Sequence, residues 1–295
     1  MQIYLQQAFN ALSVASILLL VGLGLAITFG LMRVINMAHG EFIMAGAYMT
    51  YLCGQIFKTN PNVAFLVAIP FAFLVTAALG YLLESTVISR LYGRPLDTLL
   101  ATWGVSLILQ QAARSIFGSQ NVDVATPTFL SGQLSAGPLT MPYLRLFIIA
   151  LSIACVLGTA YFLYRTPWGR RIQAVMQNRN MAACLGISTR RVDAIAFSLG
   201  SGLAGIAGCA VALLGSIGST TGVNYIVDAF MTVVLGGVGS VMGTVAGAIG
   251  IGILGTGWET VTNASLGKVL AFVCVIAFLQ WKPAGLIAVK SRALD

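Results

Sequence analysis

Long apolar runs separated by short polar stretches dominate the pattern of residues along this chain. A helix needs roughly 20 apolar residues to cross a bilayer, so the pattern predicts an all-α polytopic membrane helix bundle of about eight or nine spans. The seventh and eighth runs are short and separated by glycines, which indicates that one of them is a broken or re-entrant helix. The nine runs are 8–31, 36–56, 63–89, 97–117, 143–164, 192–216, 225–239, 241–258 and 266–281.

Glycines gather in two of these regions, 199–208 and 235–255. Gly239, Gly243 and Gly247 recur at every fourth residue and are expected on one face of a helix. In lipid, such a face lets helix backbones approach closely, so one interpretation is tight packing within the bundle. The alternative interpretation is that these glycines form a hinge or unwound segment beside a substrate path. A faint similarity between GEFIMAGA and GSVMGTVAGA is what an inverted repeat would produce.

Composition supports a membrane protein. Apolar residues make up 58% of the chain and charged residues only 8%, whereas soluble domains carry about 25% charged residues. A chain so poor in charge cannot cover a soluble surface. We therefore expect residues 1–295 to form a single transmembrane domain. The N-terminal MQIYLQQAFN lacks a basic region, which is typical of a retained first span rather than a cleaved signal.

The charges then orient the bundle. Residues 165–191 carry six arginines and no acid, which is typical of a cytoplasmic loop. This placement puts the N-terminus outside and the C-terminus in the cytoplasm. The net charge of +8 does not indicate nucleic-acid binding, because no basic stripe carries interleaved aromatics. The same placement puts Arg33, Arg90, Arg94, Lys282, Lys290 and Arg292 inside, and Lys58, Arg114, Arg145 and Lys268 on or near the outer side.

Two polar segments outside the spans carry further predictions. Residues 118–142 are too polar and too rich in proline and glycine to span, so we expect an outer loop or a short surface helix that another protein can touch. Residues 173–188 hold strong helix formers and are expected to form a short amphipathic helix that ends near Gly186. Such a helix either presents a knob to a soluble motor or rests on anionic lipid.

Catalytic and metal-binding patterns are missing from the sequence. One histidine excludes HExxH and any multi-histidine site. The single Gly-Lys pair, Gly267-Lys268, is followed by Val269, so the chain has no P-loop. The five cysteines form no CxxC, and we expect neither a disulfide nor a bound metal. The sequence therefore predicts a transport protein and not an enzyme.

The stretch VINMAHGEFIMAGAYMT opens the second apolar run with unusual polar residues. Asn36, His39 and Gly40 share one helix face, whereas Glu41 points roughly 200° from His39, so each ionisable group needs a different partner. The topology above puts both groups within two turns of the cytoplasmic end of this run. They either pin the inner mouth of a pathway or are interfacial groups bonded to loop backbone.

Three segments in order along the chain carry a resemblance. INMAHGEFIMAGAY, QNRNMAACLGI and VVLGGVGSVMGTVAGA resemble the permeases of branched-chain amino acid ABC importers. Within that family, YGRPLDTLLATWGVSLILQQ (92–111), the GSQNV after it and the closing LQWKPAGL look most like the urea-importer permease. The resemblance implies a bacterial inner-membrane subunit that pairs with a second related permease, two cytoplasmic ATPases and a periplasmic binding protein. ATP would then bind the partner subunits, and this chain would hold no cofactor.

The resemblance also assigns a coupling segment, about 166–190, that docks on an ATPase. Its coupling helix departs from the general importer pattern, because Met181 stands where a Glu is usual and two residues rather than three precede the glycine. That variation is usual for the urea-type branch. The residues assigned to coupling are Asn178, Arg179, Ala182, Ala183 and Gly186.

Our hypothesis from the sequence is therefore a permease subunit of a urea importer that works by alternating access. Urea needs a polar path without a fixed strong charge, whereas a zwitterionic amino acid needs charge partners, of which the mid-membrane sequence offers few. Branched-chain amino acids in the same machine and a passive solute channel remain the alternatives. The expected path or gate residues are Asn36, His39, Glu41, Gln110, Gln111, Asn224 and Thr232.

Overall fold

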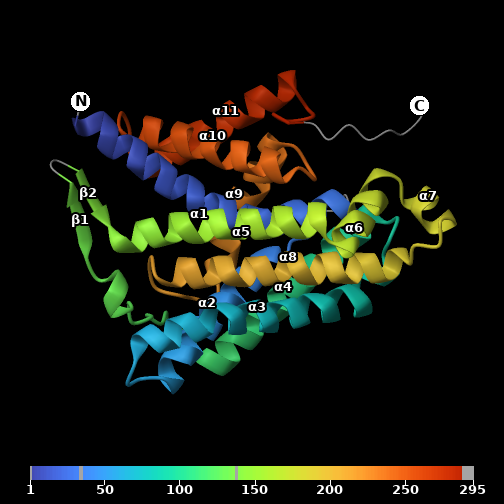
Figure 1. Ribbon diagram of the computed structural model, residues 1–295, viewed down its shortest axis with the longest axis horizontal. Coiled ribbons are helices and arrows are strands. Elements are labelled where there is room, and N and C mark those ends of the chain that lie inside the picture. The colour runs from blue at the N-terminus through green and yellow to red at the C-terminus, as the bar shows by residue number, and fades with distance from the viewer. Residues whose placement is uncertain (1, 33–35, 137–138, 288–295) are drawn as a thin grey trace.

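A computed structural model describes residues 2–32, 36–136 and 139–287 of the chain (Figure 1). Every predicted apolar run is helical in it. Arg33, Lys290 and Arg292, which the charge pattern placed inside, lie outside the described residues. The helices are α1 (Gln2–Met32), α2 (His39–Ile56), α3 (Pro61–Thr86), α4 (Pro95–Phe117), α5 (Tyr143–Arg165), α6 (Pro167–Gln177), α7 (Arg179–Cys184), α8 (Thr189–Ala212), α9 (Thr221–Gly236), α10 (Val241–Glu259) and α11 (Ala264–Trp281).

Six of the described helices are long and apolar enough to cross a membrane, namely α1, α3, α5, α8, α10 and α11. Helix α9 is apolar but shorter, with 16 residues. Helix α4 has the length of a span but carries polar residues along one face, including Thr98, Thr102 and Ser106. The fold is thus a polytopic helical membrane bundle, and the predicted count of eight or nine spans is not confirmed.

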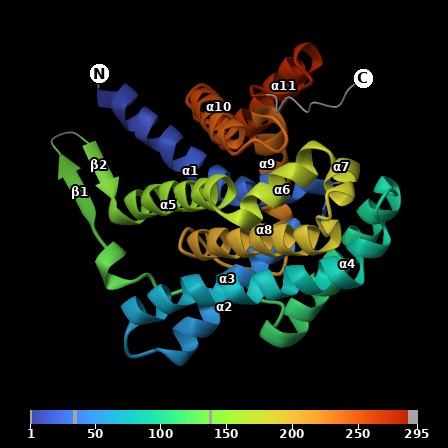
Figure 2. The same ribbon diagram turned by 45° about the vertical axis from the view of Figure 1, so that its right-hand side comes forward.

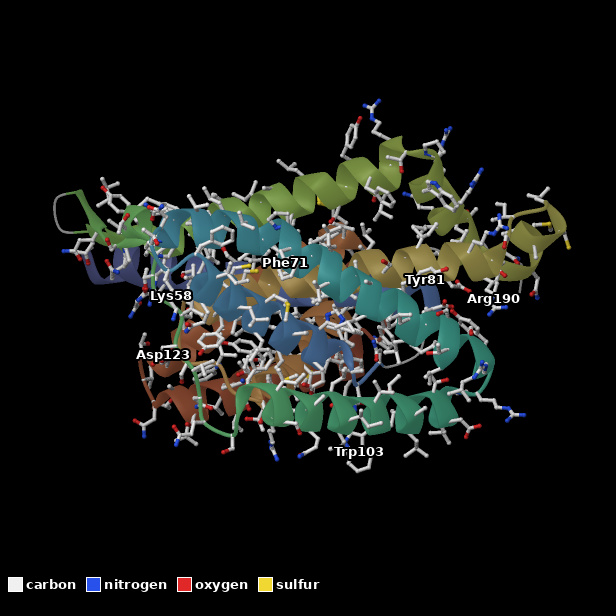
Figure 3. All side chains as sticks on the ribbon, turned by 90° about the horizontal axis from the view of Figure 1, so that it is seen from below. Lys58, Phe71, Tyr81, Trp103, Asp123 and Arg190 are labelled. Carbon is white, nitrogen blue, oxygen red and sulfur yellow. The ribbon has the colours of Figure 1, made fainter. Side chains whose placement is uncertain are left out.

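The bundle has two distinct ends (Figure 1, Figure 3). At one end lie the start of α1, Lys58, Asp123 and a small antiparallel hairpin of β1 (Gln133–Ala136) and β2 (Leu139–Pro142). At the other end lie α6, α7 and Arg190. We call these the hairpin end and the α7 end. The predicted loop at 118–142 therefore contains a hairpin and a 3₁₀ turn, Thr128–Leu130, in place of a surface α-helix.

Helix α8 runs through the middle of the bundle, between α5 on one side and α2 and α3 on the other (Figure 1, Figure 2). Its glycines allow close backbone contact: a Cβ at Gly24 of α1 would lie 2.1 Å from the Gly200 carbonyl oxygen. A Cβ at Gly46 of α2 would lie 2.2 Å from the carbonyl oxygen of Gly205. The expected close packing of the stretch 199–208 is confirmed, because no side chain fits at these crossings.

Of the three glycines expected on one face, Gly243 and Gly247 both lie on α10 against Gly236, and only the third departs. Gly239 precedes α10 and has φ +82°, so it forms the turn rather than the helix. Gly243 lies on α10 and faces Gly236, where a Cβ would meet the Gly236 carbonyl oxygen at 2.4 Å. The turn therefore brings the two helices into direct backbone contact. After α11 the chain returns to this point, where Leu286 N donates to Leu235 O at 2.8 Å.

Candidate functional site

Helix α2 begins inside the bundle and not at its edge. His39, its first residue, is completely buried and places Nε2 3.3 Å from the Val21 carbonyl oxygen of α1. Val21 lies 11 residues before Met32, the last residue of α1. At 1.5 Å per residue this corresponds to a depth of about 16 Å. His39 and Glu41 stand at the start of α2, as the sequence indicated, but this start lies against the middle of α1, because sequence spacing reports a residue's place along its helix and not where that helix starts. Their role at the mouth of a pathway stays a prediction.

The polar groups at this helix start are buried without full hydrogen bonding. Asn36 Oδ1 accepts a bond from Ala38 N at 3.0 Å, which forms a local turn just before α2. Asn36 Nδ2 and His39 Nδ1 have no hydrogen-bond partner within the described ranges. Buried polar atoms of this kind are rare in folded proteins and require an explanation such as a functional role.

Glu41 faces α4 instead of His39. Its Oε1 accepts hydrogen bonds from Ser106 Oγ and Gln110 Nε2, both at 2.9 Å. Its Oε2 is buried and has no partner among the residues the structure describes. The prediction that His39 and Glu41 take different partners is thus confirmed. Ser106 was missed, although its spacing of four from Gln110 and from Thr102 marks a polar face on α4.

Two other expected path residues do not join this cluster. Gln111 follows Gln110 on α4, so it lies about 100° further round the helix, and it is exposed. Thr232 is buried on α9 and donates to the Asp228 carbonyl oxygen at 2.8 Å. Its hydroxyl is therefore satisfied within its own helix.

Helix α9 begins opposite the start of α2, with one side of its first turn against α2 and the other side exposed. A Cβ at Gly40 would lie 2.4 Å from the Gly222 carbonyl oxygen, and a Cβ at Gly222 would lie 2.3 Å from that of Gly40. The two helix starts therefore touch backbone to backbone. Asn224 follows in the first turn of α9, where it is exposed. One turn further, Asp228 Oδ2 pairs with Lys268 Nζ of α11 at 2.8 Å.

At the α7 end, residues 166–190 form two helices and not the single helix predicted over 173–188. The break is at Asn178, whose extended backbone (φ −152°, ψ 103°) ends α6 and starts α7. The Asn178 side chain accepts a hydrogen bond from Met181 N at 3.0 Å, which is the usual N-cap arrangement. Asparagine is favoured at the N-cap position and disfavoured inside a helix. The chain therefore breaks at Asn178, where a continuous helix was expected.

The predicted end of this helix near Gly186 is confirmed. Helix α7 ends at Cys184, and Gly186 has φ +81°. Gly186 N donates to Ala183 O and Ile187 N donates to Ala182 O, at 3.0 and 3.1 Å. This pair of bonds is the Schellman motif, which places a glycine directly after the helix. Helix α7 is therefore capped at both ends by its own sequence.

Arg179 fixes this short helix to the rest of the bundle. Its guanidinium pairs with both carboxylate oxygens of Asp193, a completely buried residue of α8. The guanidinium carbon also lies 4.5 Å from the centre of the Tyr92 ring, in the loop between α3 and α4. The Tyr92 hydroxyl donates to Glu84 Oε1 at 3.2 Å. Burial raises the pKa of this hydroxyl, so it remains a protonated donor.

The other coupling residues divide into a buried and an exposed set. Ala182 packs in the core with Val192, whereas Ala183 is exposed. Met181, which the sequence marked only as a departure from the general importer pattern, and Leu185, which it did not single out, expose 59% and 75% of their surface. Helix α7 thus presents an apolar knob at one end of the bundle.

Comparisons with known proteins agree with this architecture. Residues 7–279 match a family described as branched-chain amino acid transport system / permease component. The chain is 29% identical to the high-affinity branched-chain amino acid transport system permease protein BraD of Pseudomonas aeruginosa, covering 96% of this chain and 95% of that protein. It is 28% identical to LivH of Salmonella typhimurium, with the same coverage.

A second kind of permease also matches. LivM of Escherichia coli is 26% identical over 92% of this chain and 68% of its own length, and its name describes the same type of transport system. These relatives are permease proteins of transport systems and not enzymes. With its apolar helices and a match across nearly its full length, the chain belongs to the family of permease components of branched-chain amino acid transport systems.

Proposed function

We propose that this chain is a membrane-spanning subunit of an ATP-driven importer of branched-chain amino acids in the bacterial inner membrane. The names of BraD and LivH support this cargo. LivH and LivM are separate permease proteins that both match, which supports assembly with a second, related permease. Two ATPase subunits and a periplasmic binding protein complete the machine, with ATP bound by the partners and no cofactor on this chain.

The observation that carries the proposal is the exposed knob of α7. A helix capped at both ends, fixed to α8 by Arg179 and exposing Met181, Ala183 and Leu185 suits a surface on which a separate motor pushes. In this proposal the α7 end faces the cytoplasm and the start of α1 faces the outside. The excess of arginine in this segment supports that orientation.

The translocation path in this proposal runs beside the starts of α2 and α9. Helices that start at mid-depth leave backbone and polar side chains inside a membrane bundle, which is a common arrangement in transporters. Asn36, His39, Glu41 and Gln110 line the α2 side and Asn224 lies on the α9 side. Alternating access follows when the motors move α7 and rock the attached helices.

Urea is a second candidate cargo, for one specific reason. The stretch 92–111, which looks most like a urea-importer permease, supplies Ser106 and Gln110 to the cluster around Glu41. A neutral molecule with several N–H donors and a carbonyl acceptor matches such a cluster of hydrogen-bonding groups.

Uptake by the reconstituted complex tests the cargo and the motor. Proteoliposomes that contain both permeases and the ATPases, supplied with the binding protein, should take up radiolabelled leucine only with ATP. Uptake of urea and not of leucine would overturn the cargo in favour of the second candidate. Uptake by this subunit alone, without ATP, would overturn the importer and support a passive channel.

A paired substitution tests the knob. Ala183→Arg places a bulky charge on the exposed face of α7 and should abolish co-purification of the ATPase and substrate-stimulated ATP hydrolysis. Thr86→Arg, at the exposed end of α3 and outside the coupling segment, is the matched control and should leave both unchanged. Equal behaviour of the two variants would place motor docking elsewhere.

A further inference from the structure

The pair formed by Asp228 and Lys268 is unusual for its position. Asp228 lies in the second turn of α9 and Lys268 about one turn into α11, so both charges belong to apolar helices. Ionisable groups within such helices are energetically unfavourable unless they pair or face a water-filled space, and they often mark substrate pathways. The sequence pattern alone does not connect the two residues, because they are 40 positions apart.

A cavity opens directly beside this pair. It has a volume of about 420 Å³ and is bounded by the end of α8, the first turns of α9 and Lys268. Sites for small molecules usually have volumes of about 300–1,000 Å³. A smaller cavity of about 220 Å³, between α1, α10 and α11, is also bounded by Asp228 and Lys268. The ion pair therefore stands between two spaces instead of being enclosed by side chains.

The cavity offers complementary chemistry at separate places. Lys268 carries three N–H donors, of which one is used by Asp228 Oδ2, and Asp228 Oδ1 accepts no bond from the described residues. Thr221 and Asn224 bring the N-terminal turn of α9 to the cavity wall, where the helix dipole favours a negative group. Val211 and Leu214 supply an apolar wall on the α8 side.

We propose that this cavity binds a zwitterionic amino acid with an apolar side chain. Its carboxylate pairs with Lys268 beside the first turn of α9, its ammonium group pairs with Asp228, and its side chain packs on Val211 and Leu214. The inference rests on the proposed function, since it assigns that cargo a place on this chain. It also supplies the charge partners that the sequence appeared to lack.

Transport by charge-neutral variants is the first test. In the reconstituted complex, Asp228→Asn and Lys268→Met should each lower ATP-driven leucine uptake at least tenfold while ATP hydrolysis without substrate persists. Lys58→Met is the matched control, because Lys58 is an exposed lysine at the hairpin end, lines neither cavity and has no ion pair in the described chain. Normal uptake by both variants would overturn the site and leave the importer intact.

Reversing the two charges distinguishes a role in ligand binding from a purely structural ion pair. The double variant Asp228→Lys with Lys268→Asp restores an ion pair and should restore the amount of folded complex. Leucine uptake should remain low, because the reversed pair directs the ammonium group toward the positive end of α9. Full recovery of uptake would show that the pair is only structural and would overturn the proposal.

Protection from modification gives a readout that does not depend on transport. Asn224→Cys, in a complex whose native cysteines are replaced, provides a thiol on the cavity wall. Leucine should slow its reaction with a maleimide several-fold, and Asp228→Asn should remove that protection. Leucine transport without protection would place the site elsewhere, whereas protection and transport with urea alone would overturn the cargo itself.

Discussion

Two ion pairs lie toward opposite ends of this bundle and have different surroundings. Asp193 is completely buried, and its partner Arg179 is 37% exposed and stacks on Tyr92. Asp228 is 12% exposed, and its partner Lys268 is 52% exposed and borders two cavities. The first pair ties three segments of the chain together, whereas the second joins two helices and leaves hydrogen-bonding capacity unused.

The difference teaches that similar charge pairs serve different purposes according to what encloses them. A guanidinium that makes two hydrogen bonds to a carboxylate and stacks on an aromatic ring holds the segments it joins in one fixed arrangement. A flexible lysine beside open space gives little rigidity but keeps a charge available to a ligand. Stability should therefore depend strongly on the first pair and weakly on the second.

Of the four substitutions that test this contrast, Arg179→Ala should have the largest effect on stability. It leaves the buried Asp193 carboxylate unpaired. Because the arginine itself is 37% exposed, the cost should lie below the value of about 3–5 kcal/mol for breaking a fully buried pair. We expect a clear fall in the thermal unfolding midpoint of the purified complex and in the amount of folded protein. Arg191→Ala, at an exposed arginine of the same segment, is the control and should change little. Equal midpoints for the two variants would show that the pair does not fix α7.

Arg179→Lys should have an intermediate effect. Lysine keeps the charge but loses the fork and the flat surface that stacks on Tyr92, so one strong hydrogen bond and the stacking are lost. A decrease of about 1.5 kcal/mol is expected from the loss of a charged hydrogen bond. The same unfolding measurement should place this variant between wild type and Arg179→Ala; a midpoint equal to that of the alanine variant would mean that charge alone contributes nothing.

Tyr92→Phe should have a smaller effect. The ring remains for Arg179, and only the hydrogen bond to Glu84 is lost, which corresponds to about 1 kcal/mol. Because burial raises the pKa of Tyr92, this contribution should be complete below about pH 10 and decline above it. Midpoints measured from neutral to alkaline pH should show the two proteins converging at high pH, and a constant difference would contradict the assignment.

Lys268→Met should have the smallest effect on stability. Solvated ion pairs contribute about 0–1 kcal/mol. The lysine is more than half exposed, and the Asp228 carboxylate, though only 12% exposed, borders two cavities. The unfolding midpoint should stay close to that of wild type even though leucine uptake falls. A decrease as large as that of Arg179→Ala would remove the contrast between the two pairs and make the second one structural as well.

Much of the fold follows from the sequence because long apolar runs in a membrane have few alternatives to a helix. Local spacing predicted the nine apolar runs, the end of α7 just before Gly186 and the separate partners of His39 and Glu41. The break at Asn178 was missed because a run of helix formers outweighed one cap residue. The hairpin was missed because proline and glycine were taken only as signs of a loop.

The depth of the site within the bundle and its ion pairs could not be predicted from the sequence, for a different reason. Periodicity gives the face of a helix but neither the level at which it begins nor the helix that it meets. The burial of His39 against Val21 and the contact between Asp228 and Lys268 join segments that are 18 and 40 residues apart. A single sequence contains no signal for such pairings.

The glycines of α8 have a mechanical consequence. Where Gly200 meets Gly24 and Gly205 meets Gly46, backbone lies against backbone and no rotamer stands between them. Contacts without side chains cannot yield by repacking, so α1, α2 and α8 must turn together as one stiff body. Changes in shape are therefore expected at the peripheral helices α4 and α11, whose contacts with the rest of the bundle are made through side chains that can change rotamer.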